Sequence, residues 1–268
     1  TPGTIGLHHQ MELMVANCDG FVMAVSASDG VEAGTEATLE CVQRWKKPGV
    51  CVINKADRSF SMDSILSQIR SASPMCTPVA VQMPYRDTGG ELVGVIDLVS
   101  CKAFRYLRNG TGQHSVEPIP ERLFSEFNAR RERLIEAVAL TDDILLERYL
   151  EFLTLTDDDF RNGLRDAMRR CRLMPVFFMI AEQCVGVQPL LDFMQWTLPS
   201  TTQPPMPQDT THDGQYATHL ASHLDSAGNF YHVLRLWTHA ERRGDRWVNG
   251  RTGREFKVRK YFHIRGPR

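Results

Sequence analysis

The chain has 268 residues, a length that suits one large or two modest domains and excludes peptide hormones and disulfide knots. Hydrophobic residues make up 42% and charged residues 24%, which is typical of a packed globular protein and excludes collagen, coiled coil and wholesale disorder. No apolar run approaches the roughly 20 residues that span a bilayer, so we expect no membrane segment. The seven cysteines are scattered without a Cys-x-x-Cys pair, which favours a reducing compartment and no zinc site.

The net charge of −1 conceals a strong asymmetry along the chain. Residues 235–268 carry eleven Lys and Arg against three acidic residues, which gives +8 there and −9 for residues 1–234. Such a basic end can attract polyanions such as RNA phosphates, or it can be a solvated basic face. The chain opens with Thr1-Pro2-Gly3 and no methionine, so we expect the start of a longer protein to be missing.

Short apolar runs predict buried strands at residues 21–25, 50–53, 79–83 and 175–180. Apolar residues at helical spacing predict helices at 37–45, 62–69 and 187–198. This alternation predicts an α/β fold with a mostly parallel sheet and helices on both faces.

About 90 residues separate the third and fourth predicted strands, which is too long for a simple connection. We therefore expect an inserted subdomain at about residues 86–172. Within it the sequence predicts a strand at 94–99, a helix that starts at Pro120, and two shorter helices at 144–152 and 160–171.

The remainder of the chain predicts a change of architecture after residues 1–200. Residues 201–229 are rich in proline and polar residues, which predicts a linker. Alternating apolar and polar residues in 230–268, with a tight turn at Asn249-Gly250, predict strands. About 35 residues cannot close a barrel, so we expect a partial β-barrel segment.

The tetrad Asn54-Lys55-Ala56-Asp57 directly follows the predicted strand at 50–53 and fits the Asn-Lys-x-Asp guanine motif. A ligand crevice is expected at the carboxyl ends of parallel strands. There the Asp57 carboxylate can accept two hydrogen bonds, from N1 and N2 of guanine, which adenine does not offer in that arrangement. The alternative is a strand-end turn capped by Asn and Asp.

Further motifs surround the tetrad in order: Thr1-Pro2-Gly3, Cys18-Asp19-Gly20-Phe21, Asp29-Gly30-Val31-Glu32, Arg58 after the tetrad, Gly94-Val95-Ile96-Asp97-Leu98, and Gly186-Val187-Gln188-Pro189-Leu190-Leu191-Asp192. Together with residues 131–138 and 153–160 of the expected insert, they resemble the translational GTPase elongation factor G, of bacterial or organellar type, over residues 1 to about 200. Most small GTPases lack the G-prime insert of that factor.

The resemblance implies a GTPase-like fold with a G-prime-like insert, followed by the start of a domain II-like β-barrel. It implies that the amide of Gly3, as the switch II glycine, meets the γ-phosphate. It also implies that Asn54, Lys55 and Asp57 hold guanine, and that Ala181 lies in the loop that contacts the guanine carbonyl. The residues alone also fit an ordinary turn glycine at Gly3 and a small packing residue at Ala181.

Two departures from the family pattern change what we expect. The family's catalytic histidine, which orients the attacking water, is replaced by Thr4, whose hydroxyl is shorter and cannot carry a positive charge. Weak or absent GTP hydrolysis is therefore predicted; His8 and His9 are either substitutes or helix-surface histidines. A family serine before Ala181 is replaced by Ile180, which predicts weaker nucleotide binding.

Cofactors and RNA contacts follow from the same resemblance. The phosphate-binding loop and switch I do not occur within these 268 residues. GTP or GDP with Mg²⁺ is therefore expected if those motifs lie upstream, and no cofactor otherwise. The resemblance also implies a strand surface that faces ribosomal RNA, and a bare solvated strand is the alternative. Its basic residues are Arg251, Arg254, Lys257, Arg259 and Lys260.

We accordingly expect a ribosome-associated elongation factor G-like GTPase that binds guanine nucleotides and acts in elongation and translocation. The alternative is a catalytically inactive ribosome assembly (biogenesis) factor that binds rRNA and ribosomal proteins. The expected partner is the ribosome or one of its subunits, with no membrane contact and no homo-oligomer. A mitochondrial setting is expected from the divergence of the chain, and a cytoplasmic one otherwise.

Overall fold

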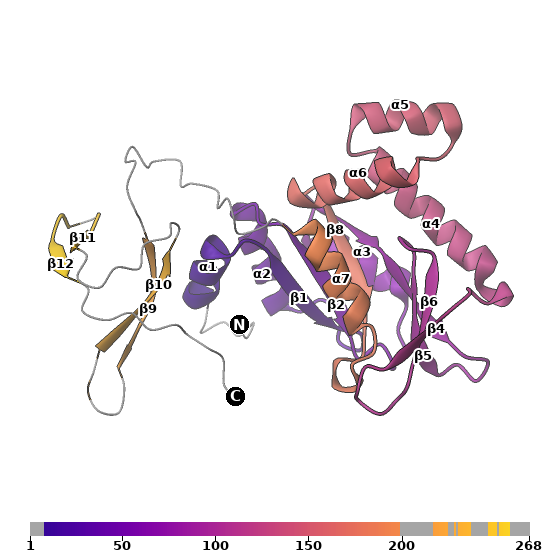
Figure 1. The fold of residues 1–268 in the computed structure, drawn as a ribbon, viewed down its shortest axis with the longest axis horizontal. Coiled ribbons are helices and arrows are strands. Elements are labelled where there is room, and N and C mark those ends of the chain that lie inside the picture. The colour runs from indigo at the N-terminus through magenta and orange to yellow at the C-terminus, as the bar shows by residue number, and fades with distance from the viewer. Residues whose placement is uncertain are drawn as a thin grey trace. The chain divides into compact units, whose positions relative to one another are not determined.

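The structure, a computed structural model, describes residues 8–198, 217–224, 228, 230–236, 246–250 and 252–257 (Figure 1). The chain divides into two compact units, Thr1–Thr202 and Gln203–Arg268, and each is described by itself. No helix among the described residues is long and apolar enough to cross a membrane.

The first unit is built on a four-stranded parallel sheet. Its strands are β1 (Phe21–Ser26), β2 (Gly49–Asn54), β3 (Thr77–Ala80) and β8 (Leu173–Phe178), in the spatial order β1-β2-β8-β3. All six residues of β8 are buried, as expected for a central strand that is covered on both faces. The predicted α/β class with a mostly parallel sheet is confirmed.

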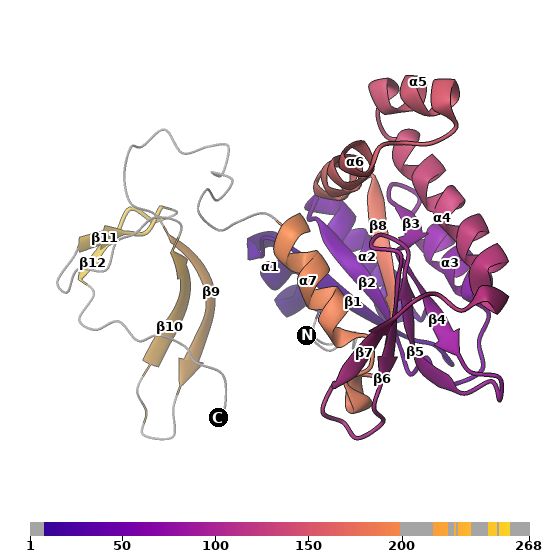
Figure 2. The same ribbon diagram turned by 45° about the vertical axis from the view of Figure 1, so that its right-hand side comes forward.

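Helices cover both faces of this sheet (Figures 1 and 2). The helices α2 (Ala33–Arg44) and α3 (Met62–Ala72) lie on one face, and α7 (Val187–Thr197) lies on the other. Helix α1 (His8–Asn17) packs against α2 through a small cluster of buried residues: Met11, Val15, Cys41 and Val42.

The excursion between β3 and β8 starts with an antiparallel meander. Its strands are β4 (Gln82–Arg86), β5 (Leu92–Asp97), β6 (Lys102–Tyr106) and β7 (His114–Glu117). The single strand predicted at 79–83 is wrong, because the chain changes sheets at Val81. The Val81 N–H donates to Val176 O of β8 at 3.1 Å, and Val81 O accepts from Leu98 N, just after β5, at 2.9 Å. One residue thus joins both sheets, which the hydrophobicity of the run does not reveal.

Three helices complete the excursion. After the short helix η2 (Glu121–Leu123), the chain forms α4 (Phe124–Ala139), α5 (Asp143–Phe152) and α6 (Asp157–Arg169). Arg131 of α4 fastens this layer to the meander, because its guanidinium donates to Leu98 O and Val99 O and lies over the Phe160 ring at 5.4 Å. Helix α5 is the outermost element in both ribbon views and buries none of its residues.

In the second unit, the described residues form two antiparallel pairs of strands. Strand β9 (Ala217–Leu224) pairs with β10 (Phe230–Leu236), and β11 (Arg246–Val248) pairs with β12 (Glu255–Lys257). Strand β9 lies inside the segment 201–229 that composition predicts as a linker. Its apolar and polar residues do not alternate strictly, so the sequence does not reveal the strand, whose main chain bonds to β10. The predicted strand residues 258–264 lie outside the described residues.

Candidate functional site

The Asn-Lys-x-Asp tetrad lies at the carboxyl edge of the parallel sheet, between the ends of β1 and β8. Its first residue, Asn54, is the last residue of β2 and stands opposite Ser26 of β1. Asn54 O accepts from Ala27 N at 2.8 Å, and Ala56 N donates to Met179 O, which follows β8, at 3.1 Å. The tetrad is therefore bonded through its main chain to the segments that follow both neighbouring strands.

The side chain of Asn54 adds a second link to the loop after β8. Its Oδ1 accepts two main-chain hydrogen bonds, from Lys55 N at 2.8 Å and from Ala181 N at 3.0 Å. Asn54 and Ala181 are 127 positions apart in the sequence. Sequence reasoning assigned both residues to guanine binding. In the structure, Asn54 Oδ1 joins the two loops.

The next three residues alternate between solvent and core. Ala56 is completely buried, while the side chains of Lys55 and Asp57 on either side of it are exposed. Lys55 has a left-handed backbone (φ 58°), and its carbonyl accepts from Arg58 N at 3.0 Å, which closes the turn. Within the described residues the Asp57 carboxylate accepts no hydrogen bond, so it can receive donors from a ligand at this edge.

Arg86 of β4 supports the tetrad from the antiparallel sheet. Its Nη2 donates to Ala56 O at 3.0 Å and to Arg58 O at 3.3 Å, and its guanidinium lies over the Phe60 ring at 6.0 Å. Phe60 in turn stacks on Phe178, the last residue of β8, with ring centroids 5.8 Å apart. Sequence reasoning missed Arg86, because no local pattern links an arginine on a strand to a turn about thirty residues earlier.

A carboxylate on the neighbouring loop adds negative charge to this edge. Asp29 follows β1, and hydrogen bonds from the hydroxyls of Ser26 and Ser28 lower the pKa of its carboxyl, with smaller contributions from the nearby charges of Lys55 and Arg58. The edge thus carries both signs of charge in exposed positions. Asp29 belongs to a family motif, but sequence reasoning assigned it no role.

The loop after β8 keeps its shape without the family's serine. Ile180, which occupies that position, is buried and exchanges two main-chain hydrogen bonds of 3.1 Å with Val185. Gly186 has φ 80°, and a Cβ there would stand 2.5 Å from Phe178 O. Main-chain bonding, the buried isoleucine and the link from Asn54 therefore hold Ala181 at the edge of the sheet.

The other predicted site residues divide into two groups. Gly3, Thr4, Arg251, Arg259 and Lys260 lie outside the described residues. Arg254 and Lys257 lie beside and in β12 of the second unit, and both are exposed.

Residues 8–10 are described as part of α1 without their side chains, so the roles considered for His8 and His9 stay predictions. Among the described residues, no group of three His, Cys, Asp or Glu side chains could hold a metal ion.

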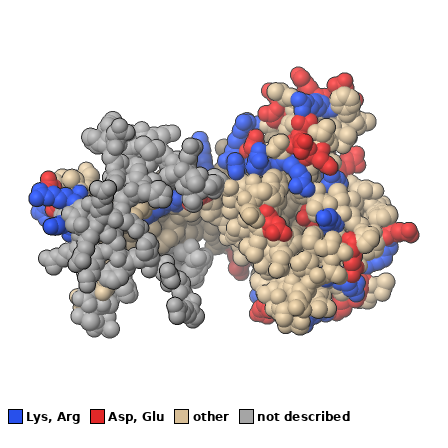
Figure 3. Space-filling model, viewed as in Figure 1, with Lys and Arg blue, Asp and Glu red and all other residues tan. Residues whose placement is uncertain are grey.

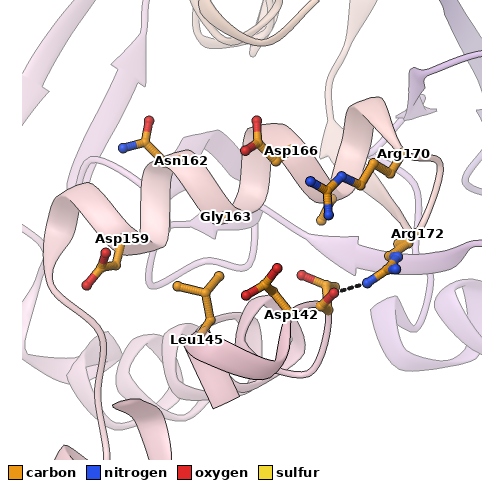
Figure 4. Close-up of a pocket in the computed structure, with 10 residues that line it drawn as sticks. Asp142, Leu145, Asp159, Asn162, Gly163, Asp166, Arg170 and Arg172 are labelled. Carbon is orange, nitrogen blue, oxygen red and sulfur yellow. Dashed lines mark hydrogen bonds between the residues drawn. The ribbon is translucent and has the colours of Figure 1, made fainter. Parts of the chain in front are cut away.

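A second concave feature lies in the helical layer of the insert, away from the tetrad (Figure 4). It is a pocket of about 180 Å³ between one face of α6 and the start of α5. In Figure 4, Asp159 lies at one end and Arg170 and Arg172 lie at the other, with Asp142 between them beside the bond from Arg172 to Thr141 O. This pocket has no aromatic wall, and it carries charges of both signs. It therefore does not resemble a purine site.

The geometry of the tetrad agrees with the comparisons to known proteins. A sequence model of the elongation factor Tu GTP binding domain matches residues 1–200. The chain belongs to this GTP-binding domain family. Elongation factor G of Aquifex pyrophilus is 34% identical over 201 residues, which are 74% of this chain and 28% of that protein. Elongation factor G of Thermotoga neapolitana is 29% identical over 221 residues, 80% of this chain and 31% of that protein.

A crystal structure from Thermus thermophilus shares the fold with a TM-score of 0.79 and 27% identity, and it covers 96% of this chain and 37% of that one. The resemblance to elongation factor G is thus confirmed, and this GTP-binding domain is a divergent one of that type. The chain spans less than a third of the length of these two curated relatives.

Proposed function

We propose that this protein binds guanine nucleotides at the carboxyl edge of its parallel sheet and acts on the ribosome as an elongation factor G-type translational GTPase. The observation that carries the proposal is the Asn54 side chain, which joins the tetrad to the Ala181 loop while Asp57 stays exposed. A turn that merely ends a strand would not need a side-chain link to a second loop.

Base selectivity comes from Asp57 in this proposal. A carboxylate accepts from both N1–H and N2–H of guanine, and adenine cannot supply this pair of donors. Sites built around such hydrogen bonds reject a base that leaves them unpaired by large factors, about 10⁴-fold in favourable cases. Lys55, beside it, can cover one face of the base with its aliphatic stem.

The experiment compares fluorescent GDP, ADP and xanthosine diphosphate on the full-length protein and on the Asp57→Asn variant. Asparagine presents an NH₂ donor, which suits the C2 carbonyl of xanthine and not the amino group of guanine. We expect the variant to lose GDP binding by at least about 100-fold and to gain xanthosine diphosphate binding. The matched control Asp158→Asn, at an exposed position of α6, should change neither. Equal binding of GDP and ADP by the unaltered protein would refute the proposal.

A second candidate function rests on Thr4. Loss of a positioned catalytic group costs about 10²- to 10⁴-fold in rate, which favours a ribosome assembly factor that kept the fold with little hydrolysis. We expect ribosome-stimulated GTP turnover to be weak in the full-length protein and to rise in Thr4→His. Strong turnover with threonine in place would remove this candidate and favour an active factor in translocation.

Two further parts of the proposal concern setting and contacts. Exposed Arg254 and Lys257 in the second unit support an RNA-facing strand surface, whose binding should weaken steeply with salt. We also propose a mitochondrial setting, supported by identities of only 29–34% to the bacterial factors. Imaging of the tagged full-length protein tests it, and a purely cytosolic signal would overturn it.

A further inference from the structure

The amino edge of the parallel sheet, opposite the tetrad, carries a basic turn at the end of α2. Lys46 has a left-handed backbone (φ 47°) and donates its N–H to Gln43 O, while Lys47 N–H donates to Val42 O, both at 3.1 Å. This pair of bonds is the Schellman motif that ends many helices. Trp45, just before the turn, is 44% exposed. The turn therefore presents an indole and two ammonium groups on a fixed backbone.

Helix α6 ends in a turn of the same geometry. Cys171 is left-handed (φ 56°) and donates to Met168 O at 2.9 Å, while Arg172 N–H donates to Ala167 O at 2.8 Å. Exposed Arg170 and Arg172 flank the cysteine. Figure 3 shows Lys and Arg side chains gathered over this end of α6.

The two turns are neighbours in space. Strands β2 and β8 lie side by side in parallel, with Cys51 opposite Val176, so the residues that lead into each strand are adjacent. The charges of Lys46 and Lys47 also reach Cys171, where they oppose the rise in thiol pKa that burial causes. We call the surface formed by both turns the amino-edge patch; it consists of Trp45, Lys46, Lys47, Arg169, Arg170 and Arg172.

The loops of the amino edge carry few acidic residues, and the carboxylates of Asp142 and Asp166 line the pocket beside Arg170 and Arg172. Asp19 carries the single carboxylate in the loops 17–20, 45–48, 73–76 and 170–172, which together hold four of the patch cations. Within the described part of the chain, Lys46, Lys47 and Arg170 take part in no ion pair. Positive charge therefore accumulates here, in a unit whose overall charge is negative.

Two of the patch arginines are held in place by main-chain acceptors. Arg169 donates to Thr197 O at 2.8 Å and to Leu198 O at 3.3 Å, and Arg172 donates to Thr141 O. Main-chain carbonyls orient a guanidinium without cancelling its charge, so both side chains keep it. Stabilisation of the helix dipoles explains a cation at each helix end, but not five cations and an exposed indole on two neighbouring turns.

We propose that the amino-edge patch binds single-stranded RNA, with its cations on the phosphates and Trp45 stacked on an unpaired base. Basic grooves with an aromatic platform are how proteins bind single strands, since every base has a stacking face. Guanidinium groups also match the paired oxygens of phosphate. An acidic polypeptide would use the same cations but would gain nothing from the indole. The proposal goes beyond nucleotide binding and does not depend on it, because the two sites occupy opposite edges of the sheet.

The test measures fluorescence anisotropy of a labelled, unstructured RNA of about 12 nucleotides with the full-length protein over a range of salt concentrations. Lys46→Gln with Arg170→Gln removes one cation from each turn. Each phosphate contact on a single strand contributes about 0.7 to the salt slope, or about fivefold in affinity at 0.1 M salt, so we expect about 25-fold weaker binding. Trp45→Ala should weaken binding about tenfold, and Trp45→Phe should restore most of it.

The matched control is Lys102→Gln with Arg133→Gln, two exposed cations of the insert that lie outside the patch. An equal loss of affinity in this control would overturn the proposal, because it would show a general charge effect. Displacement of the RNA by polyglutamate at equal charge concentration would also overturn it in favour of an acidic protein partner. The measurements are repeated with Arg254→Gln and Lys257→Gln present, where the patch variant must still lower affinity. Asp57→Asn should leave RNA binding intact, which separates this proposal from the nucleotide site.

Discussion

The two edges of the parallel sheet are formed by the same strands but are stabilised by different kinds of hydrogen bonds. At the carboxyl edge, the Asn54 side chain joins two loops, and Arg86 braces the tetrad from another sheet. At the amino edge, each turn is closed within its own helix end, by main-chain bonds around Lys46 and Cys171. The carboxyl-edge loops thus depend on contacts between distant segments, whereas the main-chain turns of the amino edge depend on local geometry, and distant carbonyls there orient only the arginine side chains. Substitutions should therefore act differently at the two edges.

The largest effect is expected where a side chain would enter the space between loops at the carboxyl edge. Gly186→Ala places a Cβ 2.5 Å from Phe178 O in a left-handed backbone, so the free energy of unfolding should fall by about 2 to 4 kcal/mol in urea titrations. Gly90→Ala is the control, because its φ of 84° is similar and nothing lies within 4 Å of the added atom. It should cost only about 1 kcal/mol. Equal losses would show that the close approach at Phe178 does not matter.

Asn54→Ala tests the link between the loops directly. The amide of Ala181 would lose its acceptor, which should cost about 1 to 3 kcal/mol in unfolding free energy and weaken guanine nucleotide binding, while RNA binding at the amino edge stays unchanged. The control is Asn109→Ala, whose side chain accepts hydrogen bonds within its own turn, from Thr111. That change should stay within about 0.5 kcal/mol. Intact nucleotide affinity in Asn54→Ala would contradict the assigned role.

A change of opposite sign is expected at the amino edge. Lys46→Gly puts the residue that best tolerates a left-handed backbone at φ 47°, so thermal denaturation should show a gain of about 0.5 kcal/mol. RNA affinity should fall at the same time, because a cation is lost. Lys47→Gly removes the same charge at a position that needs no left-handed backbone, and it should not stabilise the protein.

The smallest effect concerns acid stability at the carboxyl edge. The pKa of Asp29 is lower than its usual value of 3.8, chiefly through the Ser26 hydroxyl, so its contribution is complete above about pH 4 and is lost as pH falls through the lowered pKa. Asp29→Asn should therefore lower Tm slightly at neutral pH, where the contribution is complete, and flatten the dependence of Tm on pH below pH 4. A steeper acid loss in the variant would contradict this sign.

The sequence was informative where the candidate site residues lie in one short segment. The tetrad sits directly after a buried strand, so its place at the carboxyl edge followed from parallel topology. The role of Asn54 as a link did not, because Ala181 is distant in sequence and near only in the fold. Arg86 was missed for the same reason.

The predicted strand boundaries were wrong where apolar content was the only criterion. The run at 79–83 is apolar apart from Gln82, and hydrophobicity does not tell which sheet a residue joins. Strand β9 was missed because its apolar and polar residues do not alternate strictly, while its ladder is made by the main chain. Both errors concern hydrogen bonds of the backbone, which side-chain patterns report only indirectly.

The two main-chain hydrogen bonds of Val81 affect how the first unit unfolds. Its N–H is engaged by β8 and its carbonyl by the chain after β5, and the side chain is 1% exposed. Neither sheet can separate from the other without breaking one of these bonds in the dry interior. The insert and the parallel sheet should therefore unfold as one cooperative block. The Val81 amide should exchange its hydrogen for deuterium only when this whole block unfolds.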